Sequence, residues 1–350
     1  MTVPIGIPRA KASEIQSVSS DVGYAKHGHY FTSSLSDEAL ANQLTNFRAP
    51  LSVIYQVTRR CNFDCNFCSE IDQLRDPALG EIQTVHDNLH GVSRVFLSGG
   101  EPLIRRDIVD IVDMFSDYIV GIPTNATRGV KLAPKLAGKV SFMNVGLEGP
   151  RNATNKVRGD YDAIMAGIFA FREAGLEVSL SSVVLRSLLE DLPYLIQIGD
   201  VLQAGKIKLI HPIRKGNGAN LPDSEFLSLE ESAQLFARLD AERSKNGWRP
   251  QLRMTTWTPD TEGYSILIYP DSTAWAWPVY GGYTDRGNQG GTTDKTMYLG
   301  NLRSESIQDI WEKYPFKLNH LKKYLGKSIS VSDSGAGVIS ARRKQHAVER

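Results

Sequence analysis

The chain has 350 residues, in which 40 Lys and Arg nearly balance 39 Asp and Glu, and it contains only three cysteines. This length can bury a full hydrophobic core, the balanced charge makes nucleic acid an improbable partner and gives no support for an anionic membrane, and so few cysteines argue against a disulfide framework. We see no signal peptide and no apolar run long enough to cross a membrane, so we expect a cytoplasmic protein.

Residues 1–48 show little regular pattern and are predicted to form an N-terminal extension. One short helix is expected over residues 36–44, because Asp37 and Glu38 would stand in its first turn. A segment packed over the rest of the chain, a lid or a loosely ordered arm would each fit this composition.

From residue 51 onward, strand and helix patterns alternate in six units. The first strand, over residues 51–58, has apolar side chains at alternate positions from Leu51 to Val57. Repeated strand–helix–strand units force a parallel sheet with right-handed crossovers. Six units are too few to close an eightfold barrel, so residues 49–222 are predicted to be an α/β domain, an open (β/α)6 partial TIM barrel. The later strands are expected over 94–97, 118–122, 140–147, 177–185 and 206–213, and helices over 108–115, 130–136, 161–174 and 189–203.

After residue 222 the pattern changes to a small α+β C-terminal extension, residues 223–327. An amphipathic helix begins after Ser228, a plausible N-cap. The Ser- and Gly-rich segment 328–350 is predicted to be a disordered tail. Within the extension, strands are expected over 249–257, 264–269 and 274–280, helices over 228–243 and 304–314, and a loop over 281–295.

All three cysteines follow the first strand with the spacing C-x3-C-x2-C, at Cys61, Cys65 and Cys68. Three soft thiolates so close together indicate a metal centre, and three ligands leave a coordination position open for chemistry. The next histidine is His86, which disfavours a compact zinc site. A zinc knuckle or three unrelated cysteines remain the alternatives at this point.

With Phe67 directly before the last cysteine, this motif resembles that of the radical S-adenosylmethionine (SAM) enzymes. The resemblance implies one [4Fe-4S] cluster on Cys61, Cys65 and Cys68, with SAM chelated to the fourth iron. One unit later, Gly99-Gly100-Glu101-Pro102 resembles the motif that holds the SAM amino group. Its glycines let the backbone approach a ligand closely, and a carboxylate can accept hydrogen bonds from an ammonium group.

Five further side chains near strand ends match the family less closely. Asn125 stands in Thr-Asn-Ala, where the family typically has Thr-Asn-Gly. Glu148 stands where the family has Asp, two residues after a Gly that replaces Ser. The resemblance implies that SAM or substrate contacts involve Asn125, Glu148, Arg158, Ser182 (or its neighbour Ser181) and Arg214, the last as an anchor for a carboxylate or phosphate.

The C-terminal extension resembles the SPASM/twitch region of many radical SAM enzymes, which normally binds auxiliary clusters. Here Trp275, Trp277 and Pro278 stand where cysteines would be expected. The resemblance therefore implies a SPASM-like scaffold without auxiliary clusters. Its aromatic side chains either line a substrate pocket or form a hydrophobic hairpin packed on the barrel.

The resemblance implies an enzyme that generates a 5′-deoxyadenosyl radical, which abstracts hydrogen from a substrate carbon. We expect a small natural-product intermediate of the sugar, nucleoside or aminocyclitol type, and a redox-neutral or C–C-forming outcome. The reaction class (lyase, isomerase, transferase or oxidoreductase) stays open. The expected partner is a one-electron reductant such as flavodoxin or ferredoxin. Radical modification of a ribosomally synthesised peptide is one alternative, and a non-enzymatic metal-cluster protein is another.

Overall fold

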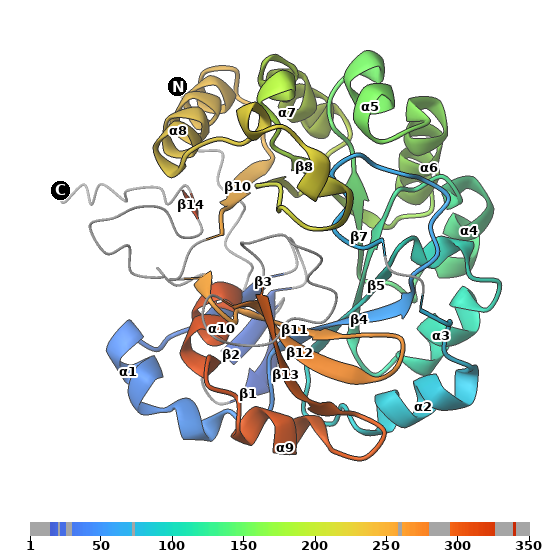
Figure 1. Ribbon diagram of the computed structural model, residues 1–350, viewed down its shortest axis with the longest axis vertical. Helices are drawn as coiled ribbons and strands as arrows, with labels where there is room; N and C mark the ends of the chain where they lie inside the picture. Colours follow the sequence, from blue (N-terminus) through green and yellow to red (C-terminus); the bar gives the residue numbers. More distant parts are fainter. Residues whose placement is uncertain are drawn as a thin grey trace.

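A curved sheet with helices along its outer face organises the computed structural model (Figure 1). The structure describes residues 15–19, 22–25, 30–71, 74–257, 261–279, 295–325 and 339–340. In these residues the large sheet has 11 strands in the order β13-β12-β11-β4-β5-β6-β7-β8-β9-β10-β14. From β11 through β4 to β10, every neighbouring pair is parallel. The parallel strands are β4 (Ser52–Thr58), β5 (Arg94–Gly99), β6 (Ile119–Thr124), β7 (Phe142–Gly146), β8 (Glu177–Val183), β9 (Lys206–Ile210), β10 (Gln251–Thr255) and β11 (Ser265–Ile268).

The helices between the strands bury one apolar face against the sheet. Ser228 caps α8 by accepting from the Glu231 N–H, and Glu231 accepts in return from the Ser228 N–H. Asp160 caps α6 in the same way, through the Ala163 N–H. The helices of this layer are α2 (Leu79–Asp87), α3 (Ile108–Met114), α4 (Gly129–Leu136), α5 (Arg151–Val157), α6 (Tyr161–Glu173), α7 (Leu192–Val201) and α8 (Leu229–Lys245).

The predicted α/β fold, an open partial barrel built from six βα units, is confirmed. Two features differ. Parallel strands β10 and β11 extend the sheet at its two ends, and α2 and α5 lie where the sequence pattern indicated loops. The pairing of β11 with β4 joins Leu267 to Ile54. A contact over so many residues leaves no trace in local periodicity.

Residues before β4 are more regular than predicted. The strands β1 (Ile15–Ser19), β2 (Val22–Ala25) and β3 (Tyr30–Ser33) form a three-stranded antiparallel sheet. The sequence shows little regular pattern there, because strands of four or five residues are too short to show clear alternation. Phe31 is buried with its ring 4.8 Å from the guanidinium carbon of Arg94, at the start of β5. The described part of this segment therefore packs over the barrel. The expected short helix is present as α1 (Asp37–Asn42).

The C-terminal residues complete the same sheet. Antiparallel strands β12 (Thr273–Val279) and β13 (Lys295–Asn301) follow β11, and the helices α9 (Ile307–Glu312) and α10 (Lys317–Tyr324) lie near α1 in Figure 1. The expected strands and the last helix are present, whereas β13 was not predicted. The expected loop 281–295 lies outside the described residues except for its last position. The expected tail also lies outside them, except that β14 (Ile339–Ser340) pairs with β10.

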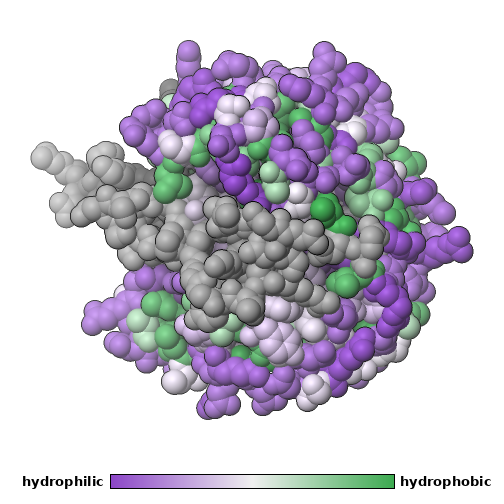
Figure 2. Space-filling model, viewed as in Figure 1, coloured by the Kyte–Doolittle hydropathy of each residue, from purple (hydrophilic) through white to green (hydrophobic). Residues whose placement is uncertain are grey.

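Hydrophilic side chains dominate the visible rim formed by the outer helices (Figure 2). Among the described helices, none is both long and apolar enough to traverse a bilayer. In the described residues, the larger of two hydrophobic clusters joins side chains from the N-terminal sheet, the barrel and the C-terminal helices, among them Tyr24, Val53 and Trp311.

Candidate metal centre and cofactor pocket

The three cysteines lie in the loop after β4, at the C-terminal edge of the parallel strands, as the sequence predicts. Cys61 is exposed, Cys65 is buried and Cys68 is partly buried. Burial raises the pKa of Cys65 to about 11, although the positive charge of Arg158 acts in the opposite direction. The thiols also raise one another's pKa, which places them within electrostatic reach of one another. A bound metal would replace this cost by favouring the thiolates.

The arrangement of the three thiols indicates which kind of metal centre they could hold. In the part of the chain that the structure describes, no three His, Cys, Asp or Glu side chains converge closely enough to hold a single metal ion. An iron–sulfur cluster requires a wider spacing, because each thiolate binds a different iron atom. Three cysteines on one loop, each with its sulfur in reach of the others' charge, fit such a cluster better than a compact zinc site.

Neighbouring strand ends hold the loop in place. Asn217, after β9, donates from its backbone N–H to the Cys68 carbonyl at 2.8 Å and from Nδ2 to the Cys65 carbonyl at 3.0 Å. Asn66 donates from its N–H to the Val157 carbonyl at the end of α5. Two of the three ligands are thus fixed by backbone contacts to a distant loop. Sequence reasoning missed Asn217, and its place after Gly216 at a strand end was the available signal.

A buried charged group adjoins the last cysteine. Glu70 pairs with Arg59 and, at 3.3 Å, with Lys215. Burial opposes ionisation of Glu70, but Lys215 and Arg59 outweigh it and hold the pKa of this carboxyl below its usual range. The Glu70 carbonyl lies 3.7 Å from the Cys68 sulfur. These residues were not predicted from the sequence.

The two glycines at the end of β5 are required by close backbone approach. A Cβ on Gly99 would lie 2.0 Å from the Thr58 carbonyl oxygen, and one on Gly100 would lie 2.4 Å from that of Arg60. The Gly100 and Glu101 N–H groups donate to these same carbonyls, at 3.0 and 2.8 Å. The Gly-Gly-Glu segment is therefore fastened to the start of the cysteine loop.

The carboxylate of Glu101 is buried and occupied by the protein itself. It accepts from the Leu103 N–H at 2.9 Å, Thr124 Oγ1 at 2.7 Å and the Asn125 N–H at 2.5 Å. Burial raises the pKa of Glu101 despite these hydrogen bonds. The side chain thus orients the end of β6, and contact between this carboxylate and a ligand ammonium stays a prediction.

Asn125 connects the end of β6 to the cysteine loop. Its Nδ2 donates to Asn62 Oδ1 at 2.9 Å, and Asn62 Nδ2 donates to Thr127 Oγ1 at 3.0 Å. The next residue, Ala126, has φ = 62°. This left-handed conformation favours glycine, the residue that the family typically has at this position.

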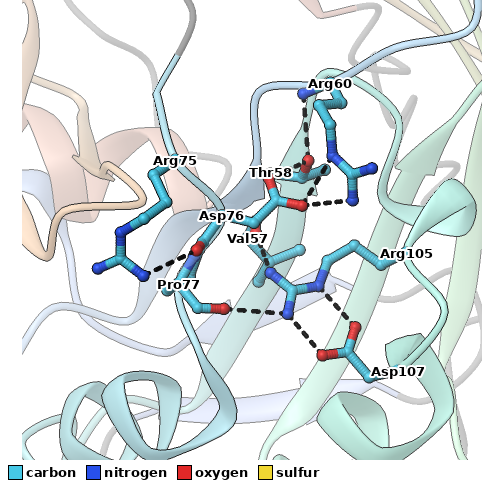
Figure 3. A network of polar contacts seen from close by, with 8 residues as sticks. All are labelled: Val57, Thr58, Arg60, Arg75, Asp76, Pro77, Arg105 and Asp107. Carbon is cyan, nitrogen blue, oxygen red and sulfur yellow. Dashed lines mark hydrogen bonds and ion pairs between the residues drawn. The ribbon is translucent and has the colours of Figure 1, made fainter.

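A second network fixes the strand that leads into the loop (Figure 3). Asp76 accepts from Thr58 Oγ1 at 2.7 Å and from Arg60 Nε at 2.9 Å. Arg105 donates from Nη1 to the Val57 carbonyl at 2.7 Å and pairs with Asp107. The guanidinium groups of Arg60 and Arg105 therefore join the end of β4 to the segments on either side of it.

Glu148, Arg158 and Ser182 are brought together, as the sequence matches suggested. Arg158 donates from Nε to the buried Glu148 carboxylate at 2.9 Å, and the Ser182 hydroxyl donates to it at 2.6 Å. A Cβ on Gly146 would lie 2.5 Å from the Arg158 guanidinium carbon, so glycine makes room for this pair. The same guanidinium lies 5.1 Å from the ring centre of Phe67. Glu148 thus supports the cysteine loop, and its contact with SAM remains a prediction.

Arg214 is the one predicted site residue that the structure places apart. It forms an ion pair with Asp223 at 2.5 Å and lies 3.8 Å from the ring centre of Phe226. Its role as an anchor for a ligand anion stays a prediction.

A cavity of about 450 Å³ runs inside the barrel and reaches the cysteine loop. Phe67, Cys68 and Ser69 line it at the loop. Trp257, Tyr264 and Trp277 form an aromatic wall, with the Trp257 and Trp277 ring centres 4.6 Å apart. The aromatic residue Trp277 of the C-terminal extension thus lines the pocket, one of the two roles expected for that segment.

Comparison with known proteins supports this interpretation of the site. Residues 55–195 match the model of the radical SAM superfamily. The chain is 32% identical over 234 residues to the GTP 3',8-cyclase of Bradyrhizobium diazoefficiens, covering 60% of this chain and 68% of that one. It is 26% identical over 203 residues to the mycofactocin maturase MftC of Mycolicibacterium smegmatis, covering 54% and 51%.

Among solved structures, SuiB of Streptococcus suis bound to S-adenosylmethionine has the same fold, with a TM-score of 0.62 at 15% identity over 80% of this chain and 72% of that one. The chain spans about half the length of most curated relatives that it matches. The cysteine loop and the Gly-Gly-Glu segment lie within the residues that the family model matches, and the chain belongs to the radical SAM superfamily, whose enzymes use a [4Fe-4S] cluster and SAM.

Proposed function

We propose that this enzyme abstracts hydrogen from a small molecule bound inside the barrel. The observation that carries the proposal is the cavity, because its lining joins Cys68 to side chains deep in the barrel. Its volume of about 450 Å³ suits a ligand of metabolite size. A sugar, nucleoside or aminocyclitol would fit this class of pocket. A substrate held there has a carbon close to the site where SAM would bind.

A bound and reduced [4Fe-4S] cluster would supply the electron for the reductive cleavage of SAM. The residues of the chain itself would bind the cluster and orient the substrate. Cys61, Cys65 and Cys68 would hold the cluster, and the Gly-Gly-Glu segment at the end of β5 fastens the start of the loop that carries them. The aromatic wall of the cavity would shield the reacting carbon from water on that side.

We further propose that residues 223–327 form a SPASM-like region without auxiliary clusters, following the barrel of residues 49–222. The support is that the sequence has no cysteine outside the loop at residues 61–68. A substrate radical in this enzyme then cannot take hydrogen from a cysteine. It would end by return of hydrogen from deoxyadenosine, by elimination, by C–C bond formation, or through a tyrosine or an external reductant, and we favour a redox-neutral or C–C-forming outcome.

A peptide substrate is the second candidate. The match to the maturase MftC favours it, although that match covers about half of each protein. A cavity enclosed by the barrel would admit one or two side chains of a peptide rather than a long segment. A one-electron reductant such as flavodoxin or ferredoxin would serve either reaction.

Anaerobic reconstitution tests the proposal. We expect about four irons and four sulfides per chain, and cleavage of SAM to deoxyadenosine and methionine on reduction. The Cys65→Ala variant is expected to lose both the iron–sulfur content and the cleavage of SAM. Candidate small molecules and short peptides labelled with deuterium are then compared. Transfer of deuterium into deoxyadenosine from peptides alone would contradict the small-molecule proposal, and retention of zinc without SAM cleavage would contradict the enzyme assignment.

A further inference from the structure

The end of the cavity farthest from the cysteine loop is lined by five cationic side chains. They come from four separate elements of the fold, so no local sequence motif unites them. All five line the same cavity: Arg94 of β5, Lys206 and Lys208 of β9, Arg253 of β10 and Lys323 of α10. We call this group the lumen cation cluster.

Strand geometry directs these side chains inward. Along β9, Lys206, Lys208 and Ile210 are the more accessible positions, and the residues between them are buried against the helices. Lys208 is the register partner of Arg253 on β10. Like charges directly opposite on neighbouring strands destabilise a sheet. The fold keeps this repulsion in place at the centre of the barrel.

The described residues provide little negative charge to offset the repulsion among these five cations. Within the part of the chain that the structure describes, no carboxylate forms an ion pair with the three lysines of the cluster or with Arg253. Glu177 is the acidic group that acts on Lys206, and it acts more weakly than Lys208 does. Arg253 Nε is buried without a hydrogen-bond partner among the described residues.

The neighbours of these cations include aromatic rings and serine hydroxyl groups. Lys323 Nζ donates to Ser265 Oγ at 2.7 Å and lies 3.6 Å from the ring centre of Tyr264. Lys206 Nζ lies 5.3 Å from the ring centre of Phe142. Such contacts leave most N–H donors of the ammonium groups free to bind an anion.

Burial and mutual repulsion both weaken the charged form of the lysines. Burial, followed by the charges of Arg94 and Arg253, lowers the pKa of Lys208 to about 8. The pKa of Lys323 is also lowered, by burial and then by Lys208 and Arg94. An anion in the cavity would reverse these effects and hold all five side chains charged.

The position of the cluster defines the shape of a ligand. Arg94 begins β5 and Gly99 ends it beside the cysteine loop, five residues later. At about 3.3 Å per residue, these two levels are roughly 16 Å apart. Phe96 and Ser98 line the cavity between them. An elongated molecule could therefore place an anionic end on the cations and a carbon near the cluster site.

We propose that the lumen cation cluster binds the phosphate or diphosphate group of the substrate, which is thus a phosphorylated small molecule. This rests on the proposed function, and names the substrate class for the same cavity. Several Arg and Lys donors converging from different directions match the oxygens of phosphate esters. The enclosed position inside the barrel disfavours a nucleic-acid backbone as the anion.

The test measures binding of inorganic diphosphate to the full chain with its cluster reconstituted, by calorimetry at pH 7 and low salt. We expect binding by the wild-type protein and a loss of about tenfold or more in affinity for Lys208→Met and Arg253→Met. Lys131→Met, an exposed lysine on α4, is the matched control and should bind as the wild type does. Absent binding, or equal binding by Lys208→Met and Lys131→Met, would overturn the proposal.

Two further measurements separate the outcomes. Melting of Lys208→Met at an equal or higher temperature than wild type shows that it is folded, since one opposed charge has been removed. SAM cleavage by the wild-type protein reports the proposed function independently. Cleavage without diphosphate binding overturns only the phosphate proposal, and binding without cleavage overturns only the enzyme function. Tighter binding of a hexaglutamate peptide than of diphosphate, through the same residues, would replace phosphate by peptide carboxylates.

Discussion

Arg158 and Glu148 form a buried pair beside the cysteine loop, with Nε 2.9 Å from the carboxylate oxygen. The same arginine lies against Phe67, and its backbone carbonyl is 4.0 Å from the Cys65 sulfur. The pair therefore transmits the position of β7 and β8 to the loop that carries the metal ligands.

Replacing Glu148 by glutamine should be costly. The buried Arg158 would lose its counter-charge, and breaking one side of a buried ion pair costs about 3 kcal/mol in the free energy of unfolding. Urea denaturation measures this, and iron content after reconstitution should fall in parallel. Glu190→Gln removes an exposed carboxylate that lies 4.0 Å from Arg238, so its stability should stay within about 0.5 kcal/mol of wild type. Equal stabilities of the two variants would contradict the role of the pair.

Gly100→Ala should displace the cysteine loop. The new methyl group would meet the Arg60 carbonyl oxygen at 2.4 Å, so the backbone must shift. We expect reduced iron content and a lower melting temperature. Gly80→Ala is the control, because no atom lies within 4 Å of its added methyl group and it stands in helix α2. There alanine should raise stability by up to about 1 kcal/mol.

Ala126→Gly should stabilise the protein. Alanine at φ = 62° carries a strain of about 1 kcal/mol, which glycine does not. We expect a gain of a few tenths to about 1 kcal/mol in the free energy of unfolding. Ala166→Gly, on the exposed face of α6, should instead lose about 1 kcal/mol. A loss at both positions would show that Ala126 is not strained.

Lys208 should make stability depend on pH. Its pKa is about 8 in the folded protein, against about 10.4 in an unfolded chain. Between these values the unfolded chain binds more protons, so stability should rise as pH increases from 8 to about 10.4. Below pH 8, Lys208 is charged in both states, and the full destabilisation caused by burying its charge is present. Melting temperatures of wild type and Lys208→Met across this window give the contribution as a difference, and parallel curves would refute it.

Much of the site was visible in the sequence because it depends on adjacent residues. Cys61, Cys65 and Cys68 share one loop, and Gly99 and Gly100 share one turn. Glu148 was also identifiable, since it follows the end of a strand. The sequence could not reveal that its carboxylate is occupied by Arg158 and Ser182, because those hydrogen bonds depend on three-dimensional packing.

The lumen cation cluster was beyond sequence reasoning for a related reason. Lys206 and Lys208 alternate with apolar residues, a pattern that equally fits a solvent-facing strand. Arg253 and Lys323 belong to the C-terminal extension, whose position relative to the barrel the sequence does not reveal. The parallel pairing of β10 with β9 puts Arg253 opposite Lys208, and the packing of α10 adds Lys323 to the same cavity.

The pairing of β11 with β4 has a consequence for biosynthesis. β4 leads directly into the metal-binding loop, and one of its two neighbours is formed by residues 265–268. On the ribosome, β4 emerges about 200 residues before that neighbour. Until then β4 has one unpaired edge, and the metal-binding loop that follows it lacks the support of β11. We therefore expect stable iron loading only after residues 265–268 have been translated.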